Sequence, residues 1–356
     1  MLDFTRAHYL DMTHPSSTLA PWDSLTTGRP AVLKEVPSTP RLRRSLALLT
    51  GCDDALLHRS TLHALSDCVG VLAGPGDTVL VEEGTYAVGL AAASQAASRG
   101  VVVRKFRHAD PEDLAARLRR CRGRPLVLLD GYCTRCATAA PLSEYVEATR
   151  RRDGLVVVDD TQAFGVLGAD PKRHPPYGLG GGGTARWAGV GPASVVTVAS
   201  AAKAFGAPFT AVTGERAVVR RLARDGGMRM HASPPSAADV AAGVRAMELN
   251  ARDGDARRSR LAAVVTRFRS RLRRGGVPMP AGSFPIQNLP RLPRGQAEPL
   301  YRRITADGVR TVLRAPTEGR ALCVTFLLTA AHTDAETDHA ADVAARAWAE
   351  VVRRAS

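Results

Sequence analysis

The sequence lacks any long apolar run. No such stretch approaches the roughly 20 residues that a helix needs to cross a bilayer. The N-terminus also lacks the basic start and apolar centre of a signal peptide. We therefore expect a cytoplasmic protein with no membrane partner. The chain has 356 residues, which suffice for one large domain and a smaller one.

Lysine is scarce, although the net charge is +15. Nearly all the positive charge is arginine, and the arginines are scattered through helical stretches without an interleaved aromatic patch. This distribution argues against nucleic acid as a partner. An anionic substrate or a phosphorylated carrier would also suit a basic protein. The lysines are Lys34, Lys105, Lys172 and Lys203.

The six cysteines are too scattered to indicate a disulfide framework. Cys133 and Cys136 form one CxxC motif. A zinc site would need a second pair, or histidines at matching spacing, and the sequence shows neither. We interpret the motif as two unrelated thiols and expect no metal site.

From about residue 55 to 215, short apolar runs alternate with helical stretches. Continuously apolar strands that alternate with helices predict an α/β fold, with a mostly parallel sheet covered by helices on both faces. The Gly-rich run 178–183 is not followed by the Lys and Ser/Thr of a phosphate-binding loop, so we expect a mobile surface loop there. The expected strands are Thr78–Val81, Val101–Phe106, Pro125–Leu129, Leu155–Val158 and Val195–Ala199, and the expected helices include Val88–Ser98 and Pro111–Arg120.

The pattern changes after about residue 235. Two helices are expected, Ala237–Asn250 and Arg257–Arg274, the second with its many arginines on a solvated face. Strands at Pro285–Leu289 and Leu322–Leu328 follow, and a last helix opens at Thr333. We therefore predict an N-terminal arm and helix over 1–50, a large domain over 51–248, and a small α+β domain over 249–356.

Two segments carry candidate chemistry. Asp159 directly follows the apolar strand Leu155–Val158, and ligands of open α/β sheets bind at the carboxyl ends of strands. A helix cap or a turn would also explain an acid there. Lys203 follows the strand Val195–Ala199 among small and apolar residues, where desolvation favours the neutral amine that attacks an aldehyde. Ser200, three residues before it, could hold a phosphate.

Together these residues predict a pyridoxal 5′-phosphate (PLP) site. PLP needs an amine for its aldehyde, a carboxylate for its pyridine nitrogen and donors for its phosphate. The motifs HYLDMTHP (8–15), VDDTQAFGVLG (158–168) and SAAKAFG (200–206) resemble, in the same order, those of the α-oxoamine synthases. That group contains 8-amino-7-oxononanoate synthase and glycine C-acetyltransferase, and it belongs to fold type I of the PLP enzymes.

The resemblance implies a role for each matching residue. Lys203 would form the Schiff base, Asp159 would pair with the pyridine nitrogen, and Tyr86 would stack on the ring as the third catalytic residue. The cofactor-binding set that it implies is Lys203, Asp159, Gln162, Ser200, Thr61, Leu62, Tyr86 and Thr134.

Three positions depart from the family pattern. Tyr86 and Gln162 stand where the family has histidines, and Thr325 stands where it has the arginine that holds the substrate carboxylate. Tyr86 can stack but cannot shuttle protons near neutral pH as an imidazole does. The substrate carboxylate would then be masked, removed or held by another arginine, with Arg314 the first choice and Arg320 the second.

The expected function is that of a PLP-dependent transferase acting on an amino acid or amine. Decarboxylative condensation with an acyl thioester, on coenzyme A or an acyl carrier protein, is one reading. Transamination, or β/γ-elimination or replacement, would need the same lysine and aspartate. A cofactor-free descendant of the fold is the non-enzyme alternative. The family resemblance also implies a homodimer.

Overall fold

The computed structural model describes residues 1–280, 282–314 and 321–353. The chain divides into two compact units, which we describe separately. The large unit comprises Met12–Cys133 and Ala139–Gly254, and the small unit comprises Met1–Asp11, Thr134–Thr138 and the residues from Asp255 on. The N-terminal arm, expected as one segment over 1–50, is thus divided between the units. The observed C-terminal boundary lies close to the expected one at residue 248.

The large unit contains a seven-stranded sheet in the order β2-β10-β9-β8-β5-β3-β4. All neighbouring strands are parallel except at β10, which is antiparallel to both β2 and β9. The expected mostly parallel sheet is therefore confirmed, and β2 and β10 are strands that the sequence pattern did not predict. The strands are β2 (Asp54–His58), β3 (Thr78–Glu82), β4 (Val102–Phe106), β5 (Pro125–Asp130), β8 (Leu155–Asp159), β9 (Val195–Ser200) and β10 (Thr210–Gly214).

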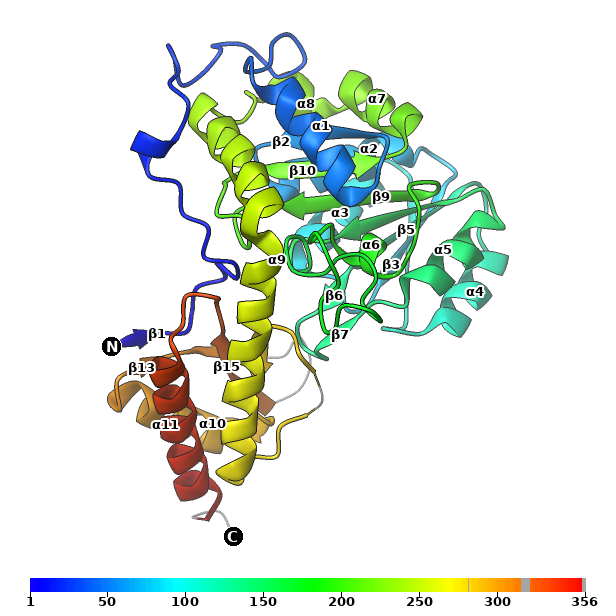
Figure 1. Ribbon diagram of the computed structural model, residues 1–356. Helices are drawn as coiled ribbons and strands as arrows, with labels where there is room; N and C mark the ends of the chain where they lie inside the picture. Colours follow the sequence, from blue (N-terminus) through cyan, green and yellow to red (C-terminus); the bar gives the residue numbers. More distant parts are fainter. Residues whose placement is uncertain (281, 315–320, 354–356) are drawn as a thin grey trace. The chain divides into compact units, whose positions relative to one another are not determined.

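Helices cover both faces of this sheet because alternate strand residues point to opposite sides. Leu126, Leu128 and Val157 belong to one buried cluster, whereas Val127 and Val156 belong to another. The first cluster includes side chains of α2 (Thr61–Leu72), α3 (Ala87–Ala97) and α7 (Arg216–Asp225). The second includes side chains of α4 (Pro111–Arg119), α5 (Leu142–Arg150) and α6 (Thr184–Trp187). Figure 1 shows the two layers.

The remaining elements of the large unit are short or lie beside the sheet. The short strands β6 (Tyr132–Cys133) and β7 (Thr138–Ala139) follow β5, and the residues Thr134–Thr138 between Cys133 and Ala139 belong to the small unit. The other helices are the 3-10 helix η1 (Ser16–Thr18), α1 (Thr39–Thr50) and α8 (Gly227–His231).

The small unit is α+β, as expected. An antiparallel sheet is built around β15 (Ala321–Leu327), which pairs with β11 (Ile286–Asn288), β12 (Leu292–Pro293) and β14 (Val312–Arg314). The N-terminal β1 (Leu2–Asp3) pairs with β13 (Val309–Arg310). The helices α10 (Arg294–Ala306) and α11 (Asp334–Arg353) complete the unit.

Two helices expected near residue 250 are one. Helix α9 runs without a break from Ala237 to Arg274. Its basic C-terminal half is also less solvated than expected. Arg258 and Arg269 are buried, and Arg260, Arg267 and Arg271 form ion pairs with Asp334, Asp338 and Asp342 of α11.

The Gly-rich run 178–183 is an ordered, largely buried segment, so its interpretation as a mobile surface loop was wrong. Gly183 donates its N–H to the carbonyl oxygen of Leu167 at 2.7 Å, and the carbonyl of Gly181 accepts from Gly165 at 2.8 Å. Gly183 has a φ of +95°, and a side chain there would collide with the Asp160 carboxylate. The glycines of this run allow its backbone to pack closely against neighbouring residues; they do not make the segment mobile.

In the described part of the chain, no helix has the length and apolar character that a transmembrane span requires.

Candidate functional site

Lys203 lies in the turn that follows β9, where the two predicted motifs pack against each other. Gly165 adopts a φ of +87°, and any side chain there would collide with Ala204. The rings of Phe164 and Phe205 form an edge-to-face pair with centroids 4.9 Å apart. The Gly165 backbone conformation and the aromatic pair therefore bring the segment 158–168 against the segment 200–206.

Asp159 ends β8 and is buried. Its Oδ1 accepts a hydrogen bond from the Thr161 N–H at 3.1 Å. Burial raises the pKa of Asp159, whereas the hydrogen bond from Thr161 and the positive charge of Lys203 lower it. The hydroxyl of Thr161 in turn accepts from the N–H of Ser200 at 3.1 Å, which links the carboxylate to the segment that carries the lysine.

The neighbouring Asp160 faces different partners. Its two oxygens accept hydrogen bonds from the N–H and the hydroxyl of Thr184, at 2.8 and 2.6 Å. Burial raises the pKa of Asp160 to about 7, with the Thr184 hydrogen bonds opposing the shift. Asp160 therefore fixes the start of α6, while Asp159 is the acid electrostatically coupled to Lys203.

A set of donors suited to a phosphate lies at the N-terminus of α2. Ser60 caps the helix by accepting from the His63 N–H at 3.3 Å. The hydroxyl of Thr61 lies 3.4 Å from that of Thr210, which pairs with Ser200 across strands β10 and β9. Helix N-termini favour anions because their N–H groups point outward along the macrodipole. The hydroxyls and the helix end fit the phosphate of PLP.

Leu62 follows Thr61 and is exposed, so its predicted contribution is through the backbone.

Tyr86 lies at the N-terminus of α3 and is 65% exposed. Its backbone N–H donates to both oxygens of Asp130, each at 3.1 Å. Asp130 ends β5 and pairs in register with Asp159 on β8. Burial raises the pKa of Asp130 to about 8, and the charge of Asp159 adds to the shift. Asp130 was not predicted, although it follows an apolar strand just as Asp159 does.

Gln162 is half-buried and lies in the turn after β8, in the segment that packs against the lysine turn. The structure thus brings together, within the large unit, the segments that carry Lys203, Asp159, Gln162, Ser200 and Thr61. The last predicted contacts, Thr134 and Arg314, both belong to the small unit.

Arg314 lies on β14 and donates to Thr134. Its Nη2 is 2.8 Å from the Thr134 hydroxyl, and the Thr134 carbonyl accepts from Asn288 at 2.7 Å. Thr325 is buried and donates its hydroxyl hydrogen to the side-chain oxygen of Asn288 at 2.8 Å. The residue of β14 that pairs with Thr325 is Val312. Arg314 lies two residues further along β14, so it is diagonally across from Thr325 on the same face of the sheet.

A pocket of about 370 Å³ opens beside these residues within the small unit. Arg135, Arg269, Arg291 and Arg314 line it, together with Asn288 and Cys323. An anionic group entering this pocket would find several guanidinium donors. Arg320, the second alternative for the missing arginine, lies outside the described residues.

The aminotransferase class I and II family profile matches residues 28–343. Among curated proteins, the 8-amino-7-oxononanoate synthase of Alkalilimnicola ehrlichii is 31% identical over 306 residues, covering 85% of this chain and 75% of the relative. The enzyme of the same name from Pseudomonas aeruginosa is 29% identical, covering 87% of this chain and 75% of the relative.

Solved structures of PLP enzymes share the fold. The serine palmitoyltransferase of Sphingomonas wittichii superimposes with a TM-score of 0.87 at 20% identity, covering 99% of this chain and 88% of the other. The 8-amino-7-oxononanoate synthase of Francisella tularensis has a TM-score of 0.75 at 17% identity, with coverage of 100% and 99%. A similar fold, with a TM-score of 0.85 at 19% identity, holds bound PLP in a serine palmitoyltransferase from S. paucimobilis.

Proposed function

We propose, because this chain belongs to the aminotransferase class I and II family and within it to the α-oxoamine synthases, that it condenses an amino acid with an acyl thioester. The carbonyl carbon of the thioester would bond to the amino acid's α-carbon, and CO2 and the free thiol would leave. The observation that carries the proposal is the 31% identity with 8-amino-7-oxononanoate synthase over 85% of the chain.

The residues of the large unit fit PLP, which when bound withdraws electrons from the α-carbon of an amino acid. The amine of Lys203 would hold the cofactor's aldehyde carbon. Asp159 would keep a proton on the pyridine nitrogen, and this role agrees with its burial and its coupling to Lys203. The hydroxyls of Thr61 and Ser200, with the N-terminus of α2, would bind the phosphate.

Other residues would complete the cofactor site. Tyr86 would stack on the ring, Gln162 would donate to the phenolic oxygen, Leu62 would offer its backbone N–H to the phosphate, and Thr134 would approach the ring. Because neither Tyr86 nor Gln162 is an imidazole, this site would not use the histidine pair that the family has at these positions.

Arg314 would hold the substrate carboxylate. It lies on the same sheet face as Thr325, the position that carries the family's arginine, and it borders a pocket lined by further arginines. The acyl donor would be presented on coenzyme A or on an acyl carrier protein, whose phosphates suit a basic protein. A cytoplasmic homodimer is the assembly that we propose from the family.

The cofactor site is tested by borohydride reduction of the purified protein, followed by peptide mapping. We expect the pyridoxyl label on Lys203, and none after Lys203→Ala. A label on Lys34, Lys105 or Lys172 would overturn the assignment.

The reaction is tested by a matrix of amino acids and acyl-CoAs, with CO2 and free thiol measured together. We expect the two products in equal amounts for the accepted pair. Keto-acid formation without thiol release would identify a transaminase instead.

A further inference from the structure

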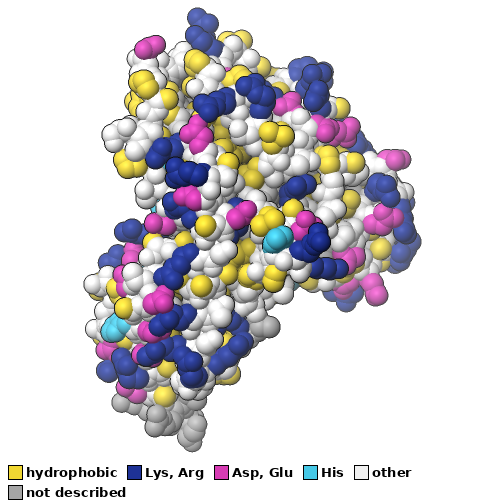
Figure 2. Space-filling view, in the orientation of Figure 1, with side chains coloured by type: hydrophobic (Ala, Val, Ile, Leu, Met, Phe, Trp, Pro, Cys, Tyr) yellow, Lys and Arg dark blue, Asp and Glu magenta, His cyan; other side chains and the backbone are white. Residues whose placement is uncertain are grey.

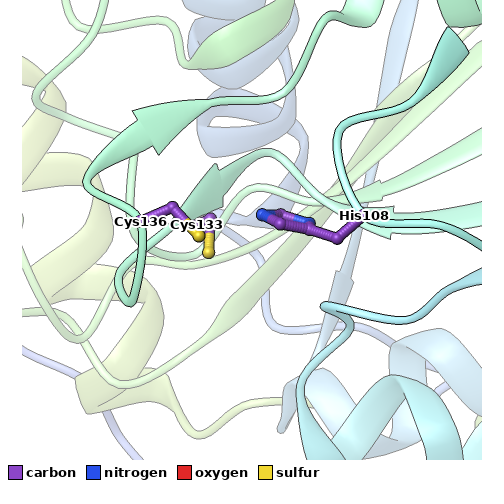
Figure 3. A group of neighbouring side chains, drawn as sticks. All are labelled: His108, Cys133 and Cys136. Atoms are coloured by element: carbon purple, nitrogen blue, oxygen red, sulfur yellow. The ribbon is translucent and has the colours of Figure 1, made fainter.

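We propose that His108, Cys133 and Cys136 form a binding site for a borderline-soft divalent metal ion such as Zn²⁺. One ring nitrogen and the two Sγ atoms all lie within 4.8 Å of one another. Figure 3 shows the ring of His108 pointing toward the two sulfur atoms. Imidazole and thiolates are the ligands that zinc prefers.

The strand order explains how these residues meet. In the large sheet, β3 lies between β5 and β4. Cys133 belongs to the hairpin that follows β5, His108 follows β4, and Glu82 ends β3 between them. The sequence did not suggest a metal site because His108 follows a different strand, β4, and lies far from the CxxC motif along the chain.

The histidine is oriented by a buried carboxylate, as metal-bound histidines commonly are. Oε2 of Glu82 lies 3.0 Å from Nδ1 of His108. Oε1 of Glu82 accepts from the Tyr145 hydroxyl at 2.8 Å and from the Ala109 N–H at 3.0 Å, so the carboxylate is held in place. A proton on Nδ1 that is shared with Glu82 leaves Nε2 as the coordinating atom.

The spacing requires only a small contraction. Ligand atoms around a tetrahedral zinc lie roughly 3.3 to 3.8 Å apart, given Zn–S and Zn–N bonds of about 2.3 and 2.0 Å. The limit of 4.8 Å thus calls for a shift of about 1 Å. Cys136 is exposed in the turn joining β6 and β7, where such a shift meets little packing. A disulfide would use the same two thiols but would leave the Glu82–His108 arrangement without a role.

The site would fix the turn that carries Thr134. Thr134 and Arg135 lie between the two cysteines, so a bound metal would close the CxxC turn around them. This inference does not depend on the proposed reaction, because metal binding can be measured without turnover.

The test measures metal content of the PLP-loaded protein, purified under reducing conditions and equilibrated with Zn²⁺. We expect one zinc per chain by mass spectrometry of the elements, and loss of that zinc in Cys133→Ser and Cys136→Ser. Cys52→Ser is the matched control, because Cys52 is a free cysteine outside the cluster, and it should retain the metal. Glu82→Gln should weaken zinc affinity by about 10- to 100-fold.

Two results would overturn the proposal. One is the absence of zinc from the reduced wild-type protein after equilibration. The other is equal metal content in wild type, Cys133→Ser and Cys136→Ser. If the serine variants fold poorly, Co²⁺ titration of the wild type decides the matter, since thiolate coordination gives a charge-transfer band that His108→Asn should shift or abolish. A Cys133–Cys136 disulfide that persists in place of metal uptake would be one form of the first result.

Discussion

At the scale of single residues, the adjacent carboxylates of Asp159 and Asp160 interact with different partners. Asp159 is electrostatically coupled to Lys203, whereas Asp160 accepts two hydrogen bonds from Thr184 and packs against Gly183. Adjacent residues at the end of a strand point to opposite sides, so we expect only one of the two to meet a ligand held by the lysine.

Asp159→Asn and Asp160→Asn should therefore fail in different ways. We expect Asp159→Asn to lose most activity with little change in melting temperature. Asp160→Asn should unfold more easily by about 1–3 kcal/mol, because an amide cannot accept both Thr184 hydrogen bonds. Turnover and chemical denaturation separate the two effects. Greater loss of activity in a well-folded Asp160→Asn would show that the other acid serves the cofactor.

Arg314→Ala tests the substrate side. Removing a charge-assisted partner of a carboxylate costs about 1.5–3 kcal/mol, so KM for the amino acid should rise about tenfold or more. Arg291→Ala is the control, since Arg291 lines the same pocket but is exposed. Unchanged amino-acid binding in Arg314→Ala would exclude this arginine as the carboxylate partner.

At the scale of elements, the sequence predicted best where apolar runs are continuous. Strands β3, β4, β5, β8 and β9 and the start of α11 were predicted, because their signals are local. Strand β10 was not, since its short run resembles a loop and its antiparallel pairing is decided by distant partners. Helix α9 continues through Gly254, a residue that suggests a break but is buried in the fold.

The candidate site shows the same limit. Lys203 and Asp159 were predicted as site residues because each follows an apolar strand. Asp130 has the same signal and was missed, and the partners of Asp160 could not be foreseen because Thr184 lies beyond an irregular segment.

Thr333→Ala should destabilise the small unit through α11. Thr333 accepts from the Glu336 N–H at 3.2 Å, and Glu336 accepts from the Thr333 N–H at 2.8 Å. Loss of such a cap costs about 1 kcal/mol. Denaturation should show this loss, while Thr333→Ser should remain close to wild type. An unchanged stability of Thr333→Ala would mean that the ion pairs of α9 and α11 alone hold the helix end.

At the scale of the whole molecule, the high net charge conceals extensive local pairing. Figure 2 shows Lys and Arg interspersed with Asp and Glu over the visible face. Several arginines of α9 are engaged with α11. These ion pairs engage part of the 49 lysines and arginines, but an excess of 15 positive charges over the 34 acids remains.

Stability should fall as the pH falls below about 6.5. His58 is buried beside Asp67, and burial followed by the charge of Arg229 lowers its pKa to about 3. The unfolded histidine gains a proton below its ordinary pKa while the folded one stays neutral, so acid favours unfolding. Between pH 7 and 5, wild type should lose about 2 kcal/mol more than His58→Gln. Urea titrations at both pH values measure the difference, and parallel losses would contradict the assignment.

Asp130 and Asp159 pair in register, and this pairing should couple ligand binding at Asp159 to the release of a proton from Asp130. Asp130 has its pKa raised to about 8, partly by the charge of Asp159, so near neutral pH it is largely protonated. A cation that neutralises Asp159 removes that repulsion, the pKa of Asp130 falls, and a proton passes to the solvent. Cofactor loading would then become tighter as the pH rises, and its heat would depend on the buffer that takes up the proton. At these two strand ends, the bound cation would thus replace a proton.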